Sequence, residues 1–169
     1  EENLLEEART AEEFMMQNKN ITNSEGATRS YSQNTVTLLT SKDFIGTYRK
    51  TFHSLSCIAI AGQDTNMQRD FEYSSSIYAS DLKKPKKIGI KAANRASSRL
   101  NSKKIKSCTL DVVFEPRVAK GILSSFASCA SGSSIARKTS FLDKKINTSI
   151  LKNNITITNN PRLKRGLGS

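Results

Sequence analysis

The sequence predicts an α+β fold, in which a mostly antiparallel sheet packs against two or three helices. Residues 85–100 and 116–130 repeat apolar side chains every four positions, which is typical of amphipathic helices. Residues 34–61 and 109–114 are instead rich in β-branched and aromatic residues, which favours strands. Because strands cluster before and after the helices and do not alternate with them, we expect antiparallel pairing.

The first half of the chain is expected to hold one helix and most of the sheet. Residues 2–17 place apolar side chains, from Leu4 to Met15, on one side and acidic ones on the other, which predicts a helix. A polar turn is expected at residues 18–24. The predicted strands are residues 34–40, 44–51 and 54–61, and after a turn at 62–66 the sheet continues through 67–78.

The second half is expected to hold two helices and two strands. Pro116 follows the apolar run 112–114 and suits the first position of a helix, where its missing N–H costs nothing. This helix is expected to end in the Ser/Gly segment 131–134 and to bury its apolar side in a core. The apolar stripe of that helix consists of Val118, Ile122, Phe126 and Ala130. A last strand is predicted at residues 150–158.

Composition excludes some classes of protein. The chain has 169 residues, 36% of them hydrophobic, and no run approaches the ~20 apolar residues that a membrane span needs. The first residues are acidic, which is unlike a signal peptide, so we expect a cytoplasmic protein without membrane contact. Cys57, Cys108 and Cys129 are scattered in apolar surroundings and predict three buried, reduced thiols.

Charge is distributed unevenly along the chain. Residues 1–81 carry 7 Lys/Arg and 12 Asp/Glu, a net charge of −5, whereas residues 82–169 carry 20 and 3, a net charge of +17. The basic half is consistent with a nucleic-acid surface, with an acidic protein partner, or with codon bias toward lysine. Aromatic residues make up only 7%, so stacking platforms for bases are few.

Residues for catalysis are sparse. His53 is the single histidine, and without a positioned partner it is expected to be structural. One histidine cannot form a His-based zinc site. The sequence contains neither a G-x-S-x-G elbow nor a Gly-rich phosphate loop, so a serine hydrolase and a P-loop enzyme have no support.

Several sequence blocks, in order, resemble the TldD/PmbA metallopeptidase family and specifically its PmbA (TldE) branch. They cover nearly the whole chain, which is similar to a central segment of less than half of a family member. The blocks are residues 21–26 (ITNSEG), 51–56 (TFHSLS), 66–73 (NMQRDFEY), 81–82 (DL), 88–100, 137–142 (RKTSFL) and 163–169 (LKRGLGS).

The resemblance implies a cytosolic bacterial peptidase system. Its TldD and PmbA subunits form a heterodimer that cleaves unfolded peptides, and the family is also named as a modulator of DNA gyrase. The TldD branch carries H-E-x-x-x-H on the helix that corresponds to residues 116–130. Here Ser124 and Ser125 stand at the His-Glu pair and Cys129 at the second His. Serine is not a zinc ligand at neutral pH, so no metal is expected in this chain and zinc is expected in a TldD-type partner.

The resemblance also implies a division of the chain within a larger two-domain protein. Residues 1–20 would end an N-terminal helix and linker, residues 21–107 would form a central α+β segment, and residues 108–169 would lead into a β-rich C-terminal domain. For contact with a peptide or the partner we single out Arg69, which with Asp70 is expected to close a strand, together with Arg137 and Lys138, which follow the helix without ligands.

Three functions of different classes follow. The first is a non-catalytic subunit of a TldD/PmbA-type metallopeptidase. The second is an active metallopeptidase with ligands outside this chain. The third is a basic module that binds DNA, gyrase or another acidic partner, and its DNA form predicts affinity that falls steeply with salt.

Overall fold

The computed structural model describes residues 2–152 and 154–168. The chain divides into two compact units, which are treated separately below. The first unit comprises Glu1–Lys104 with Asn160–Ser169, and the second comprises Ile105–Asn159.

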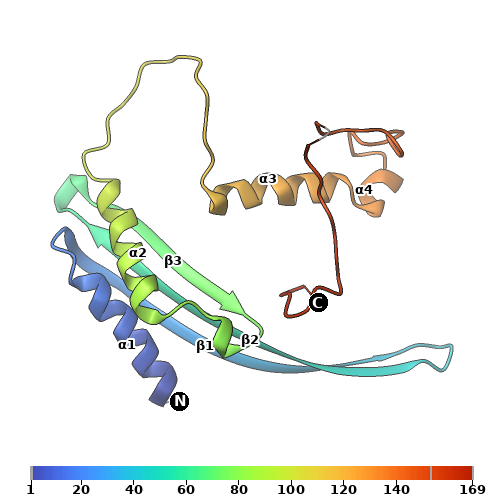
Figure 1. The fold of residues 1–169 in the computed structure, drawn as a ribbon, viewed down its shortest axis with the longest axis horizontal. Helices are drawn as coiled ribbons and strands as arrows, with labels where there is room; N and C mark the ends of the chain where they lie inside the picture. Colours follow the sequence, from blue (N-terminus) through green and yellow to red (C-terminus); the bar gives the residue numbers. More distant parts are fainter. Residues whose placement is uncertain (1, 153, 169) are drawn as a thin grey trace. The chain divides into compact units, whose positions relative to one another are not determined.

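The first unit is a three-stranded antiparallel sheet covered on one face by two helices (Figure 1). The strands β1 (Ile21–Leu39), β2 (Ile45–Ala61) and β3 (Gln68–Ser76) lie in the order β1-β2-β3. The helices are α1 (Glu2–Met16) and α2 (Pro85–Ser98), and short 3-10 turns, Asp64–Asn66 and Ala79–Asp81, flank β3. The α+β prediction is therefore confirmed, as are the helices at both predicted places.

The core lies between the two helices and the covered face of the sheet. Met15, Leu55 and Ile88 are its largest fully buried side chains. Small residues make up much of the rest, so the elements approach closely. At the crossing of the two helices, a Cβ on Gly89 would lie 2.0 Å from the carbonyl oxygen of Ala11, and only glycine fits there. The other fully buried core residues are Ala11, Cys57, Ala59, Ala61, Ala92, Ala93 and Ala96.

The strands β1 and β2 are longer than the strands predicted from the sequence. The stretches predicted as two strands at 44–51 and 54–61 are one strand, because β1 pairs with β2 continuously from Leu39↔Ile45 onward. β1 begins at Ile21, so the predicted turn at 18–24 is wrong over most of its length. The polar residues after Ile21 are tolerated because the strand lies at an edge of the sheet, and Gly26, with a φ of 95°, absorbs a β-bulge.

The second unit contains the helices α3 (Pro116–Cys129) and α4 (Gly132–Ala136) and otherwise irregular chain. The predicted helix is confirmed, but the strand predicted at 109–114 is wrong, as is the one predicted at 150–158 over its described residues 150–152 and 154–158. Val113 is 96% exposed, and in the described part of 150–158 a turn-like hydrogen bond joins Ile155 N–H to the Lys152 carbonyl. β propensity forms a strand only where another strand supplies backbone partners.

The apolar stripe of α3 is not buried. Val118, Ile122 and Leu123 are each more than half exposed, and no residue of α3 is buried. The prediction that this helix buries its apolar side in a core is therefore wrong for the described residues. Among residues 105–152 and 154–159, only a five-residue helix and irregular chain are available to cover the stripe. Within the described residues, every helix is too short or too polar to span a membrane.

Candidate functional site

The three residues that the resemblance aligns with the metal-ligand motif of the TldD branch lie on α3. Ser124 and Ser125 are exposed, and Cys129, the last residue of the helix, is partly buried. The helix stays regular to its end, where the Ala130 N–H donates to the Phe126 carbonyl at 2.9 Å. On a regular helix, positions five apart point about 140° away from each other. The side chains at 124 and 129 therefore diverge.

The residues at these positions do not fit a zinc ion. Two serine hydroxyls and one thiol lack the imidazole and carboxylate donors of a catalytic zinc site. Among the described residues, no three His, Cys, Asp or Glu side chains gather where they could hold a metal ion. Ser125 also cannot replace a glutamate as general base, because its hydroxyl is not basic at neutral pH.

The end of α3 is tied to α4 by serine side chains. The Ser131 hydroxyl caps α4, accepting from the Ser134 N–H at 3.3 Å, and donates to the Ser128 carbonyl at 2.9 Å. These two bonds explain why α3 ends where the Ser/Gly segment 131–134 predicts it. Arg137 then closes α4, and Lys138 follows with a φ of 56°. Both are exposed, and their contact with a peptide or a partner stays a prediction.

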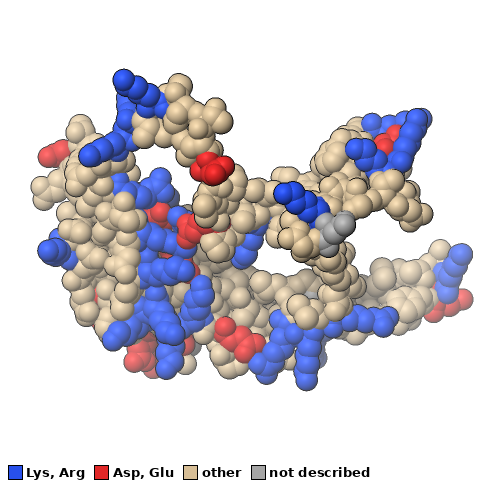
Figure 2. Space-filling model, turned by 45° about the horizontal axis from the view of Figure 1, so that its top comes forward, with Lys and Arg blue, Asp and Glu red and all other residues tan. Residues whose placement is uncertain are grey.

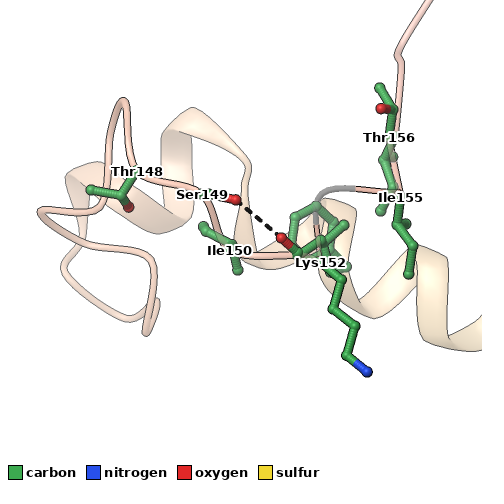
Figure 3. Close-up of a pocket in the computed structure, with 9 residues that line it drawn as sticks. Thr148, Ser149, Ile150, Lys152, Ile155 and Thr156 are labelled. Atoms are coloured by element: carbon green, nitrogen blue, oxygen red, sulfur yellow. Dashed lines mark hydrogen bonds between the residues drawn. The ribbon is translucent and has the colours of Figure 1, made fainter.

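A cavity of about 550 Å³ lies in the second unit, between α3 and the segment that follows α4 (Figure 3). Phe126 of α3 and residues 148–152 and 155–157 line it. Within the lining segment, the Ser149 hydroxyl donates to the Leu151 carbonyl at 3.0 Å. Among the described residues of this lining, Lys152 alone is charged. The cavity can hold an apolar group, but its lining offers neither a carboxylate nor an imidazole for acid–base chemistry.

A second cavity, of about 610 Å³, opens in the first unit beside the N-terminal turns of α1 and contains His53. The Arg29 side chain, only 3% exposed, pairs with Glu7 and places its Nη2 3.4 Å from His53 Nδ1. The ring of Tyr31 lies beside the imidazole, with the centroids 4.8 Å apart and the two planes tilted by 36°. In the described interactions, Arg29 and Tyr31 contact His53 and no carboxylate does, and the structural role of this histidine stays a prediction.

Arg69 lies on the uncovered face of the sheet. Its Nε donates to Glu25 Oε1 at 2.7 Å, and both side chains are about half exposed. Glu25 is the extra residue of the β1 bulge and Arg69 belongs to β3. The ion pair therefore joins the two outer strands across the central strand β2. This supports a role in fixing the sheet, while the predicted peptide or partner contact of Arg69 stays untested.

A buried carboxylate at the sheet–helix boundary was missed from the sequence. Glu72 of β3 is 4% exposed and is surrounded by Lys83 at 2.8 Å, Lys91 at 3.8 Å and Arg95. Asp70 next to it pairs with Arg99 at 3.1 Å. The sequence signal for this cluster was the four-residue spacing of the cations along α2 and its flanks, together with the alternate positions of Asp70 and Glu72 on β3.

The three cysteines differ in environment. Cys57 is fully buried, with its Sγ 3.3 Å from Met15 Sδ, and burial raises the pKa of its thiol to about 11. Cys108 is exposed and Cys129 is partly buried. The prediction of three buried thiols is therefore correct only for Cys57.

The class of protein follows from the sequence matches, which are to models of metallopeptidase domains. Residues 2–100 match the family model of the PmbA/TldA metallopeptidase central domain, and residues 107–169 match that of the C-terminal domain. The chain belongs to the PmbA/TldD metallopeptidase family. The predicted resemblance is thus confirmed.

Individual relatives agree with this assignment. A metalloprotease PmbA homolog of Buchnera aphidicola subsp. Baizongia pistaciae is 36% identical, covering 93% of this chain and 35% of the relative. Metalloprotease PmbA of Escherichia coli O157:H7 is 32% identical, covering 96% of this chain and 36% of the relative. The chain therefore spans about a third of the length of its curated relatives.

A solved structure shows the same fold. The crystal structure of a candidate modulator of DNA gyrase from Bacteroides thetaiotaomicron superposes with a TM-score of 0.78 at 31% identity. The match covers 88% of this chain and 34% of that one.

Proposed function

We propose that this chain is part of a non-catalytic, PmbA/TldE-type subunit of a TldD/PmbA-type metallopeptidase. The observation that carries this proposal is the side-chain chemistry of α3, where Ser124, Ser125 and Cys129 occupy the positions of H-E-x-x-x-H. The chain keeps the family fold while those positions lack a zinc ligand set and a general base. Its contribution is then structural.

The proposed partner is a TldD-type subunit that brings the zinc ion and the catalytic glutamate. The proposed substrate is an unfolded peptide in the cytoplasm, which the two subunits enclose together. The names of the relatives, metalloprotease PmbA and its homologs, support peptide hydrolysis as the activity of the assembly. Arg137 and Lys138, exposed after α4, are the proposed contacts to the peptide or the partner.

The zinc content of the purified protein tests the proposal, measured alone and after copurification with a TldD-type subunit. We expect zinc in the mixed complex only, at about one ion per pair. We also expect peptidase activity only when both subunits are present. Stoichiometric zinc in this protein alone would overturn the proposal and favour an active enzyme with ligands outside residues 1–169.

A basic binding module is the second candidate, and one observation favours it. Lys83, Lys87, Lys91, Arg95 and Arg99 recur every four residues along α2 and its flanks. Figure 2 shows Lys and Arg side chains covering more of one face than Asp and Glu do. Buried Glu72 and Asp70 neutralise part of this row, which weakens the case.

The DNA form of the second candidate predicts a steep salt dependence. Titrating duplex DNA at increasing salt should then lower the affinity strongly, since bound counterions are released on association. Absent or salt-insensitive binding would remove this candidate and leave the peptidase proposal untouched.

A further inference from the structure

The chain leaves the first unit after Lys104 and returns to it at Asn160. The returning residues, 160–168, lie in the family model of the C-terminal domain, whereas α1, α2 and the sheet lie in that of the central domain. We call residues 160–168 the return segment. It contains neither helix nor strand, so its place in the first unit depends on the contacts that it makes there.

The side chain of Arg165 in the return segment makes two contacts with the turn that follows β3. Its guanidinium carbon lies 4.5 Å from the centre of the Tyr78 ring, and its Nη1 donates to Asp81 Oδ1 at 2.8 Å. The ring face attracts the cation through its quadrupole, and the carboxylate adds a charge-assisted hydrogen bond. Arg165 is therefore held by two neighbouring groups of the central domain.

The backbone around Arg165 is also held. The Gly166 N–H donates to the Leu163 carbonyl at 2.9 Å and closes a turn, in which Arg165 has a φ of 63°. A residue with a Cβ rarely adopts this left-handed conformation, and it persists where the surroundings fix it. Lys50 of β2 donates to the carbonyl of Leu167 and adds a contact on the other side of Gly166.

We propose that Arg165 anchors a clasp, through which the return segment of the C-terminal domain is held on the central domain at Tyr78 and Asp81. The Arg165 and Tyr78 side chains are both about half exposed. Exposed ion pairs and cation–π contacts each change an equilibrium constant only severalfold, so the clasp can open and close. This inference goes beyond the proposed function and does not depend on the metal.

Opening the clasp would free one of two connections between the domains. Residues 101–106 join the two domain models along the chain and are unaffected by the contacts of Arg165. The C-terminal domain then gains freedom while it remains attached to the central domain. The clasp is thus a reversible conformational device.

Hydrogen exchange of the whole protein, followed by mass spectrometry, tests the anchor. Arg165→Ala should raise the exchange rate of a peptide covering residues 163–168 by about tenfold, because two severalfold contacts are lost together. Lys164→Ala is the matched control. It removes the same charge from the adjacent residue, which contacts neither Tyr78 nor Asp81 in the described interactions, and should change the rate less than about twofold. Equal rates for the two variants overturn the proposal, including the case in which another part of the protein holds the segment.

A double-mutant cycle tests the partner of the anchor. Tyr78→Leu should raise the exchange rate of the return segment severalfold in the unchanged protein and leave it unaltered in the Arg165→Ala protein, because the contact is already lost there. Tyr48→Leu, at another exposed tyrosine of the first unit, should have the same effect in both proteins. Exchange of α2 in the same spectra separates loss of the clasp from loss of the fold. Effects of Tyr78→Leu that are equal in both proteins overturn the proposal.

Discussion

Gly89 of α2 lies against the backbone of Ala11 in α1, so close that a Cβ on Gly89 would sit 2.0 Å from the Ala11 carbonyl oxygen. The close approach involves backbone atoms, which cannot rotate away as a side chain can. The two helices can therefore pack this closely only because residue 89 carries a hydrogen atom in place of a side chain.

Gly89→Ala is expected to destabilise the protein by about 3 kcal/mol, because the helices must separate or shift to admit the methyl group. Urea unfolding measures the loss. Gly121→Ala in α3 is the matched control, because a Cβ at that position would meet no atom within 4 Å apart from the backbone of its own helix. Relief of the glycine penalty should raise helix stability there by up to about 1 kcal/mol. Equal effects at both positions would contradict the close crossing.

Glu72→Gln is expected to cost about 3 kcal/mol in unfolding free energy, in the range for breaking a buried ion pair. The isosteric amide leaves the guanidinium of Arg95, itself 15% exposed, beside an uncharged group. Glu25→Gln is the control, because its pair with Arg69 is exposed and such pairs contribute less than about 1 kcal/mol. A Glu72→Gln protein as stable as the control would show that the cluster is not stabilising.

The buried thiol of Cys57 predicts an alkaline loss of stability. Burial raises its pKa from 9.0 to about 11, so between these values the folded state keeps a proton that the unfolded state releases. The stabilisation is fully present below pH 9 and is lost as pH rises toward about 11. Unfolding free energies across this window should fall more for the unchanged protein than for Cys57→Ala. Parallel pH profiles would contradict the shift.

Restoring the motif in α3 is expected to fail to create a zinc site. In the triple variant Ser124→His, Ser125→Glu and Cys129→His, the two imidazoles lie five positions apart on a regular helix and diverge by about 140°. The control Ser124→His with Ser128→His places two imidazoles four apart on one face, where they can share an ion. Zinc titration calorimetry should detect binding for the control only. Tight binding by the triple variant would show that α3 distorts readily.

Periodicity explains which elements were predictable. The four-residue repeats of residues 85–100 and 116–130 depend on local geometry, and α2 and α3 appear where they predict. Strands were less predictable, because a strand exists only through its partner. Apolar runs at 54–61 and 112–114 look alike in sequence, yet the first pairs on both sides and the second does not.

The candidate site was also only partly predictable. The positions of Ser124, Ser125 and Cys129 on a helix followed from the sequence, as did the absence of zinc-ligand chemistry there. The environment of Glu72 and of His53 did not, because their partners come from other elements, up to 24 residues away along the chain.

The sequence by itself determined the α+β class, the helices α1, α2 and α3, and the family, because side-chain period and motif order are local properties of the chain. Tertiary structure decided the single long β2, the exposed stripe of α3, the carboxylate buried under α2 and the pairing of the uncharged outer half of β1 with β2. These features depend on which segments of the chain contact each other. The free energy of such a contact comes from backbone hydrogen bonding and burial, to which both segments contribute.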